Sequence, residues 1–175
     1  VSSTNLDVAS AKTTLAQAPS LNLILWLVLL GFMLKAGIWP FHFWLSTAFR
    51  FVKPVSTVLL ALVPVSVALL GLLRWLPLGE ISSPVNGAIV QVIGVITMLF
   101  ALISMLKMTD MNNKRVEHGI IFVMTGLFFT GIGIGLANAA TWSIYEAWAY
   151  YYVAASGLVV LLVTLSTRIQ LSEDE

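Results

Sequence analysis

A long apolar run that carries one charge and is then broken constrains this chain more than any other feature. Residues 21–39 form an apolar stretch about as long as a bilayer is thick, and Lys35 lies near its end. An ammonium group in hydrocarbon is costly unless it faces a partner or water. Pro40 then removes a backbone donor and breaks the helix, and unsatisfied backbone at membrane depth is tolerated only against protein or a water-filled cavity. The stretch from Lys35 to Pro40 is therefore a candidate functional site rather than a lipid-facing surface.

The composition places the chain in the membrane class. Of its 175 residues, 59% are hydrophobic and 10% are charged, whereas a soluble domain carries about 25% charged residues. A net charge of +1 gives no reason to expect a nucleic-acid partner. The chain has no cysteine, which excludes disulfides, thiolate metal sites and covalently attached haem. The two histidines, His42 and His118, lie far apart in regions expected to be loops, so we expect no metal site and no cofactor.

The length of its apolar runs predicts an all-α integral membrane protein with about five transmembrane helices. The first helix is broken at Pro40, and we expect a half-helix or re-entrant segment over residues 41–52. Pro64 lies near the middle of the second run and should kink that helix. The five apolar runs cover residues 21–39, 55–76, 85–108, 119–136 and 142–167.

Outside the apolar runs the chain has no room for a separate soluble domain. Residues 1–20 are polar and lack the basic start and apolar core of a signal peptide, so we expect an extramembrane arm there. Residues 21–168 form a single transmembrane domain, and residues 169–175 form an acidic tail. Because the first residue is Val1 rather than methionine, we expect either a removed segment or a longer polypeptide.

Basic residues predict the orientation of the chain in its membrane. With five spans, the loop after the first span, the loop after the third and the C-terminus share a side. Six Lys and Arg residues lie on that side and two on the other. The positive-inside rule then puts the C-terminus on the cytoplasmic side. The membrane itself is either a prokaryotic cytoplasmic membrane or an organelle inner membrane.

Lys35 has two interpretations. A desolvated lysine amine can accept and release protons, which suits a relay in a buried polar channel. Alternatively, the long side chain lifts the ammonium group to the membrane interface. The helix break at Pro40 and the nearby His42 favour the relay, because a lysine that only reaches the interface needs no loose backbone beside it.

His42 and Glu146 are the other candidates for a proton path. Imidazole titrates near neutral pH, so His42 could relay protons; the alternative is an interfacial histidine in an aromatic cluster. Glu146 could pair with a cation or load protons, but a glutamate among aromatic residues more often lies at headgroup level, and we favour that interpretation. No carboxylate pair, Ser/His/Asp set or phosphate loop appears, so we expect no active site within this chain.

The sequence has Lys35 first, Pro-Phe-His-Phe-Trp-Leu at 40–45 and Pro-Val-Ser at 54–56. This order resembles the antiporter-like membrane subunits of respiratory complex I, the Mrp-type sodium/proton antiporters and the group 4 membrane-bound hydrogenases. A weaker resemblance to the Asp-Leu-Lys-Arg loop of that family covers residues 109–116. In the family, the lysine lies on a discontinuous helix within a hydrophilic axis that conducts protons. The resemblance implies that role for Lys35.

The chain departs from that family in three ways, and the first is length, because family members have many more spans than the five expected here. The next family helix carries a central lysine or histidine, whereas residues 63–65 here read Val-Pro-Val. The later helices carry further titratable residues, whereas the last run here offers only Glu146. A complete channel therefore needs residues from another polypeptide, or the chain is a shortened copy that fills space.

Two functions follow from these observations. The first is a membrane subunit of a complex I-like or Mrp-type assembly that contributes part of a proton or sodium path centred on Lys35. The second is a structural packing subunit of the same kind of complex, with no conduction of its own. In both cases the chain is a non-catalytic subunit whose partners are other multi-span membrane subunits and the lipid bilayer.

Overall fold

The computed structural model describes residues 13, 14, 17, 19–45, 47, 54–106 and 113–173, with the backbone alone for 54–62, 113–118 and most of 160–173. Five long α-helices make up this part of the chain, so the all-α prediction is confirmed for it. The helices are α2 (Leu21–Ala36), α4 (Pro54–Trp75), α5 (Pro84–Leu106), α6 (Asn113–Ala137) and α7 (Ala139–Glu173).

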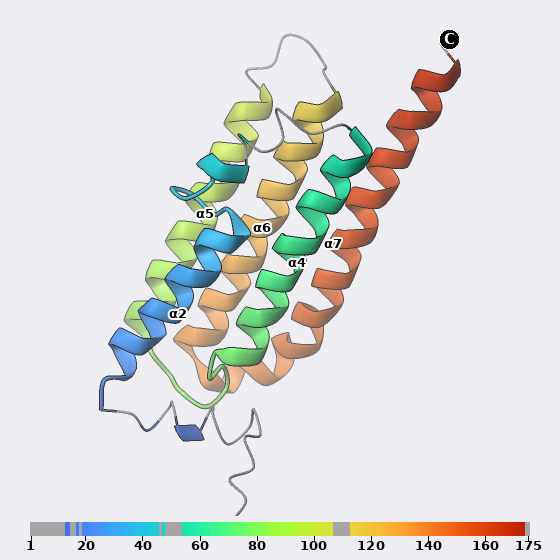
Figure 1. The fold of residues 1–175 in the computed structure, drawn as a ribbon. Helices are drawn as coiled ribbons and strands as arrows, with labels where there is room; N and C mark the ends of the chain where they lie inside the picture. The colour runs from blue at the N-terminus through green and yellow to red at the C-terminus, as the bar shows by residue number, and fades with distance from the viewer. Residues whose placement is uncertain are drawn as a thin grey trace, which may run out of the picture.

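Successive helices run in alternating directions along one bundle. Figure 1 shows that α2, α5 and α7 run toward the end of the bundle at which α4 and α6 begin, and that α2 ends well short of that end. Helices α2 and α4 therefore run in opposite directions, as the orientation argument assumes. By length and composition, α5 and residues Gly119–Ala137 of α6 could each cross a membrane, and Leu21–Ala36 and Val63–Trp75 are shorter apolar helices.

The start of α6 and the end of α7 differ from those predicted. Helix α6 begins at Asn113 rather than near residue 119, so His118 lies in a helix and not in a loop. Lysine, arginine and glutamate favour helix, and no proline or glycine interrupts residues 113–118. Helix α7 continues to Glu173, into the predicted acidic tail. The extramembrane arm lies almost wholly outside the described residues.

Prolines begin two of the helices and lie inside one of them. Pro54 and Pro84 are the first residues of α4 and α5, where the missing N–H group has no helical partner in any case. Helix α4 continues through Pro64 without interruption. The kink predicted at Pro64 stays a prediction.

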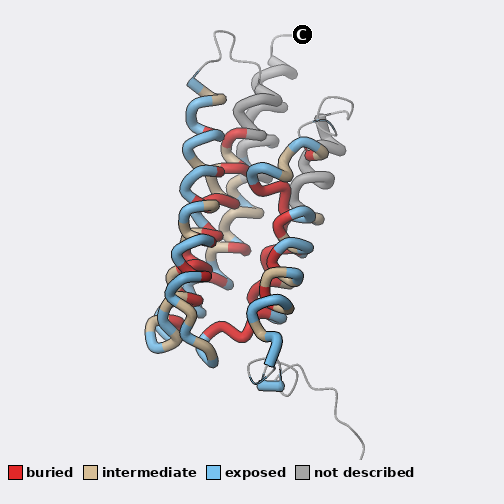
Figure 2. The backbone as a smooth tube through the Cα atoms, turned by 90° about the vertical axis from the view of Figure 1, so that its left-hand side faces the viewer, coloured by how far each residue is buried: buried red, intermediate tan, exposed pale blue. Residues whose placement is uncertain are grey.

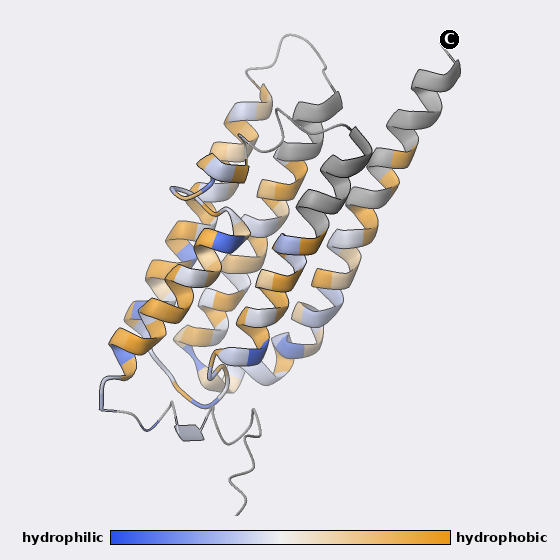
Figure 3. Cartoon of the chain, viewed as in Figure 1, coloured by the Kyte–Doolittle hydropathy of each residue, from blue (hydrophilic) through white to orange (hydrophobic). Residues whose placement is uncertain are grey.

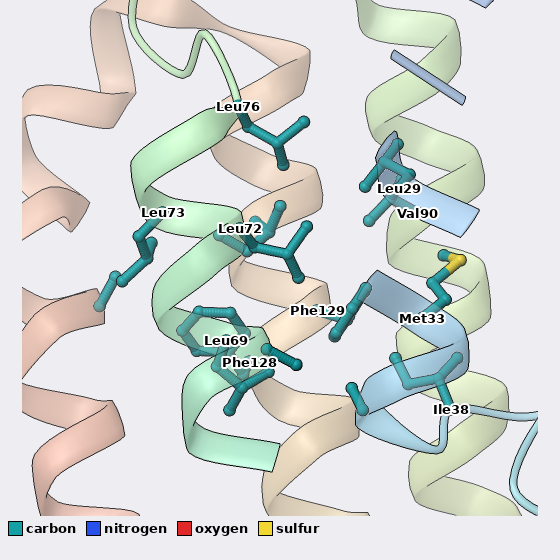
Figure 4. Close-up of a cluster of buried hydrophobic side chains, with 14 of the residues drawn as sticks. Leu29, Met33, Ile38, Leu69, Leu72, Leu73, Leu76, Val90, Phe128 and Phe129 are labelled. Atoms are coloured by element: carbon teal, nitrogen blue, oxygen red, sulfur yellow. The ribbon is translucent and has the colours of Figure 1, made fainter. Parts of the chain in front are cut away.

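The core is built from aliphatic and aromatic residues on the inner sides of the helices. Helix α2 buries Leu25, Leu29 and Met33, which are four residues apart and so share one face. Figure 4 shows Leu29 and Met33 across the same cluster from leucines of α4, with Phe129 of α6 between them. These side chains are all buried, so α2, α4 and α6 share one core.

Large apolar side chains lie on the outer surface of the described helices as well as in the core. Figure 2 shows buried residues on the inner sides of the helices, and Figure 3 shows apolar residues on the outer sides as well. Only 22% of the most apolar stretch of α5 is buried. Val92, Leu99 and Ile103 are exposed on this helix. A contiguous exposed apolar surface of this kind marks contact with lipid or protein rather than water.

Glycines let α5 and α6 touch through their backbones. A Cβ atom added at Gly94 of α5 would lie 2.7 Å from the carbonyl oxygen of Gly126 and 2.7 Å from the backbone nitrogen of Thr130. A Cβ atom added at Gly133 of α6 would lie 2.7 Å from the carbonyl oxygen of Gly87. We call these four glycines, Gly87, Gly94, Gly126 and Gly133, the glycine seam. Small residues allow this close approach of helices where burial from water gives no driving force.

A second pair of glycines on α6 receives aromatic rings from α7. A Cβ atom added at Gly131 would lie 2.8 Å from the ring of Trp148, and one added at Gly135 would meet the ring of Trp142. Trp148 stacks on Tyr152 with ring centroids 5.0 Å apart. The Tyr152 hydroxyl donates a hydrogen bond of 3.0 Å to the carbonyl oxygen of Met124. Helices α6 and α7 therefore pack through tryptophan rings of α7 that lie against glycines of α6.

Side-chain amides join α2 to α5. The indole N–H of Trp26 donates to Oδ1 of Asn86 at 3.2 Å, and Nδ2 of Asn86 donates to Oδ1 of Asn22 at 3.0 Å. Asn86 is 8% exposed, so these bonds satisfy an amide that has little access to solvent. The Asn86 side chain is thus a polar link between two otherwise apolar helices.

We predict that Gly94→Ala destabilises the bundle by about 1–3 kcal/mol, because the new methyl group meets backbone atoms that cannot move aside. Gly31→Ala is the matched control: Gly31 lies in α2 with no heavy atom within 4 Å of an added Cβ, and alanine favours helix by up to about 1 kcal/mol. Unfolding free energies in mixed detergent micelles measure both. Equal effects of the two substitutions would contradict close contact at the glycine seam.

Asn86→Leu should lower the unfolding free energy by about 1 kcal/mol, the scale of hydrogen bonds between membrane helices, because Trp26 and Asn22 lose their shared partner. Gln91→Leu on the same helix is the control, since the Gln91 side chain makes no hydrogen bond with the described residues. The same micelle titration compares them. A loss at Gln91 as large as that at Asn86 would show that the polar link carries no special stability.

Candidate functional site

The break after α2 starts at Gly37. This residue takes the left-handed conformation, with φ 68° and ψ 35°, which glycine adopts without penalty. The N–H of Gly37 donates to the carbonyl of Leu34 at 3.3 Å, and the N–H of Ile38 donates to that of Met33 at 3.2 Å. These bonds satisfy carbonyls of the last turn. The helix therefore ends before Pro40, and Gly37 supplies the conformation that ends it.

After the break the chain turns back onto α2. The Trp39–Pro40 peptide bond is cis, and residues 43–45 are helical. Residues 46 and 48–52 lie outside the described residues, so the half-helix expected over residues 41–52 stays a prediction. The indole N–H of Trp44 donates to the carbonyl oxygen of Leu34 at 2.7 Å, and a Cβ atom added at Gly37 would lie 2.9 Å from Cδ2 of Leu45. The segment is thus held against the last turn of α2.

His42 packs between α5 and α6. Its ring lies 4.7 Å from that of Phe100, at an interplanar angle of 52°, and 5.8 Å from that of Phe122, edge to face. The backbone of Pro40 lies near the imidazole, yet Nδ1 is buried without a hydrogen-bond partner among the described residues. Most buried side-chain polar atoms have such a partner, so the Nδ1 atom of His42 is an exception to that pattern.

Lys35 lies on the outer side of α2. It is exposed, as are its neighbour Leu34 and the residue one turn earlier, Gly31. Around Gly31, an added Cβ would meet no heavy atom within 4 Å. The side of the helix that carries Lys35 therefore faces away from the described bundle, and the Lys35 ammonium group has no carboxylate partner among the described residues.

Glu146 lies far from this break. It is exposed in the second turn of α7, and α7 begins at the end of the bundle opposite to the end of α2 (Figure 1). The structure thus brings Lys35 and His42 to the same break in the chain and places Glu146 toward the opposite end of the bundle. The neighbouring residue Tyr145 packs edge to face on Trp148. Aromatic residues of this kind are typical of the membrane–water interface, where the lipid headgroups lie.

The described core offers no continuous row of ionisable groups. Its buried polar residues are Asn86, Thr97 and Thr125. The two threonine hydroxyls donate to carbonyls four residues earlier in their own helices. No group of three His, Cys, Asp or Glu side chains suited to a metal ion occurs among the described residues.

Two residues that shape this site were not singled out from the sequence. Gly37 stands between Lys35 and Pro40, and a glycine just after an apolar helix is a common C-terminal signal. Trp44 appeared only as part of an aromatic cluster, because sequence does not show that its indole points back to residue 34. The role of Gly37 could have been predicted from the sequence, whereas the contact of the Trp44 indole could be found only in the folded structure.

Comparison with known proteins gives matches in one family. Residues 2–170 match the family model described as NADH:quinone oxidoreductase/Mrp antiporter, TM. The "Putative antiporter subunit mnhA2" of Staphylococcus epidermidis is 29% identical over 160 residues, covering 89% of this chain and 19% of that protein. The protein of the same name from Staphylococcus aureus (strain USA300 / TCH1516) is 34% identical over 115 residues, covering 66% of this chain and 14% of that protein. The chain thus spans less than a fifth of the length of these relatives. No solved structure matches it.

We predict that Gly37→Ala destabilises the helix end by about 1–2 kcal/mol, since an L side chain at positive φ is strained and the methyl group would press on Leu45. Gly37→Asn should cost less, because asparagine tolerates this conformation better than other L residues. Thermal unfolding in detergent ranks the two variants. If asparagine proved worse than alanine, the conformational reason would be wrong and crowding against Leu45 would dominate.

Proposed function

The chain belongs to the NADH:quinone oxidoreductase/Mrp antiporter transmembrane family, and we propose that it contributes part of a proton or sodium path centred on Lys35. As a member of this family it is an integral membrane protein of the ion-translocating kind. The observation that supports the finer proposal is the broken end of α2. One short segment presents Lys35 on its outer side and packs His42 between α5 and α6.

The outward position of Lys35 says where the path must continue. An unpaired ammonium group on an apolar helix is costly at membrane depth, and the described residues offer no carboxylate to it. The partner therefore comes from outside the described bundle. The relatives are several times longer than the matched stretch, so we propose that other multi-span membrane subunits or segments of the assembly supply that partner.

A second function is supported by a different observation. Helix α4 follows the break, and its single ionisable residue is Arg74 in the last turn. The described core likewise lacks a row of titratable groups beyond His42. These facts favour the alternative, in which the chain packs within the same kind of complex, and Lys35 anchors it through an ion pair without conducting.

The proposed placement in the membrane follows the alternating helices. We propose a multi-pass protein whose five helices all cross the bilayer, with the C-terminal end of α7 on the cytoplasmic side. The shared direction of α2, α5 and α7 (Figure 1) supports the parity of this arrangement. The basic residues of the loops support the choice of side.

Lys35→Met and Lys35→Arg together test the two functions in native membranes. Arginine keeps the charge but does not release its proton in proteins. If Lys35 relays protons, both variants should assemble normally and lose flux at least about tenfold, the scale of a lost proton-transfer group. If Lys35 is an anchor, methionine should impair assembly and arginine should restore both assembly and flux.

Proton and sodium flux in membrane vesicles, together with co-purification in mild detergent, measures these outcomes. Glu146→Gln serves as a comparison at the other end of the bundle, where we expect flux to stay within about twofold of the unmodified protein because an exposed interfacial carboxylate contributes little. Normal flux in Lys35→Met would rule out a path through Lys35.

A further inference from the structure

We propose that Trp44 is a positioning residue: its indole N–H holds the segment that carries His42 against the turn of α2 that carries Lys35. This inference rests on the proposed function, because it concerns two groups of the proposed path. It adds a residue whose part in that path lies in geometry, since the indole has no proton to exchange at accessible pH and Trp44 acts only through its neighbours.

The first step of the argument is the hydrogen bond itself. The indole nitrogen lies 2.7 Å from the carbonyl oxygen of Leu34, the residue directly before Lys35. That carbonyl belongs to the last turn of α2, where carbonyls have no regular helical partner. It also accepts the longer bond of 3.3 Å from Gly37. The indole bond is thus the shorter of the two hydrogen bonds that the Leu34 carbonyl accepts.

The second step is the pivot that the bond bridges. Gly37 is the only residue between Lys35 and Trp44 with positive φ, and glycine allows a wide range of backbone angles there. Without a contact beyond the pivot, the direction in which residues 38–45 leave α2 would be weakly defined. Trp44 and the Leu45 side chain, which covers Gly37, close that segment back onto the helix.

The third step is the far side of the same segment. His42, two residues before Trp44, contacts Phe100 of α5 and Phe122 of α6 through its ring. Phe122 is buried, whereas Phe100 is partly exposed. The short segment is therefore held on one side by α2 and on the other by α5 and α6. Loss of the indole bond should let the His42 ring move away from Phe100 while the rings themselves remain.

Cross-linking measures this geometry without any assumption about transport. The chain contains no cysteine, so cysteines placed at His42 and Phe100 of the full chain form a unique pair. A short thiol-specific cross-linker is applied in native membranes, and the linked peptides are quantified by mass spectrometry. Trp44→Phe keeps an aromatic ring and removes the donor, and we expect it to lower the cross-linking rate about fivefold, the scale of one hydrogen bond.

The matched control is Trp75→Phe. Trp75 is 52% exposed at the end of α4, and its indole makes no hydrogen bond with the described residues. We expect unchanged cross-linking there. An unchanged rate in Trp44→Phe as well would overturn the proposal, whatever the flux measurements gave.

Flux in the chain with His42 and Lys35 intact tests the role in the path. We expect Trp44→Phe to assemble normally, to lose flux about fivefold, and to show a shifted pH profile, because the two groups no longer keep their arrangement. Slower cross-linking with an unshifted pH profile would reduce Trp44 to a structural residue and refute positioning. Normal flux in the Lys35 variants would instead refute the proposed function. It would leave the cross-linking result untouched, since cross-linking does not depend on transport.

If Trp44→Phe accumulates poorly, Trp44→His replaces it, because histidine retains a ring N–H donor. The cross-linking rate is measured per folded molecule in both variants. A faster rate in Trp44→His than in Trp44→Phe supports the proposal. Equal loss in both variants counts against it, since the donor would then be immaterial.

Discussion

Backbone contact between α5 and α6 is the constraint on which the rest of the bundle depends. Gly94 and Gly126 lie against each other's helices, and no larger residue would allow that approach. The resulting helix pair presents Asn86 to α2 and two phenylalanines to His42. The broken segment is thus positioned by a surface that exists only because the two helices touch. In an apolar solvent such contact comes from shape and hydrogen bonding rather than from exclusion of water.

The fold treats the two candidate groups of the break differently. His42 is enclosed by rings from two helices, and its segment is tied to α2 by Trp44. Lys35 receives no such contacts and faces outward. The position of the imidazole is therefore set within this chain, whereas the surroundings of the ammonium group depend on what lies beside α2.

Much of the fold could be read from the sequence because apolar length and proline placement are local signals. The apolar runs gave the helices, and Pro54 and Pro84 mark two helix starts. The prediction placed the end of α2 at Pro40. The helix ends at Ala36, because Gly37, which precedes the proline, takes the left-handed conformation. The start of α6 at Asn113 was missed because charge was taken as a sign of loop, while lysine, arginine and glutamate also favour helix.

The site was less accessible to sequence because contacts between distant residues decide it. The residue order around Lys35 indicated a broken helix and its family, yet gave no direction for the lysine side chain. Helical geometry gives the reason: side chains two positions apart in an α-helix point to nearly opposite sides. Met33 is therefore buried while Lys35 is exposed. A lysine on the buried side would require its carboxylate within this bundle. On the outer side it requires a neighbour, and the family relationship to much longer proteins is consistent with that need.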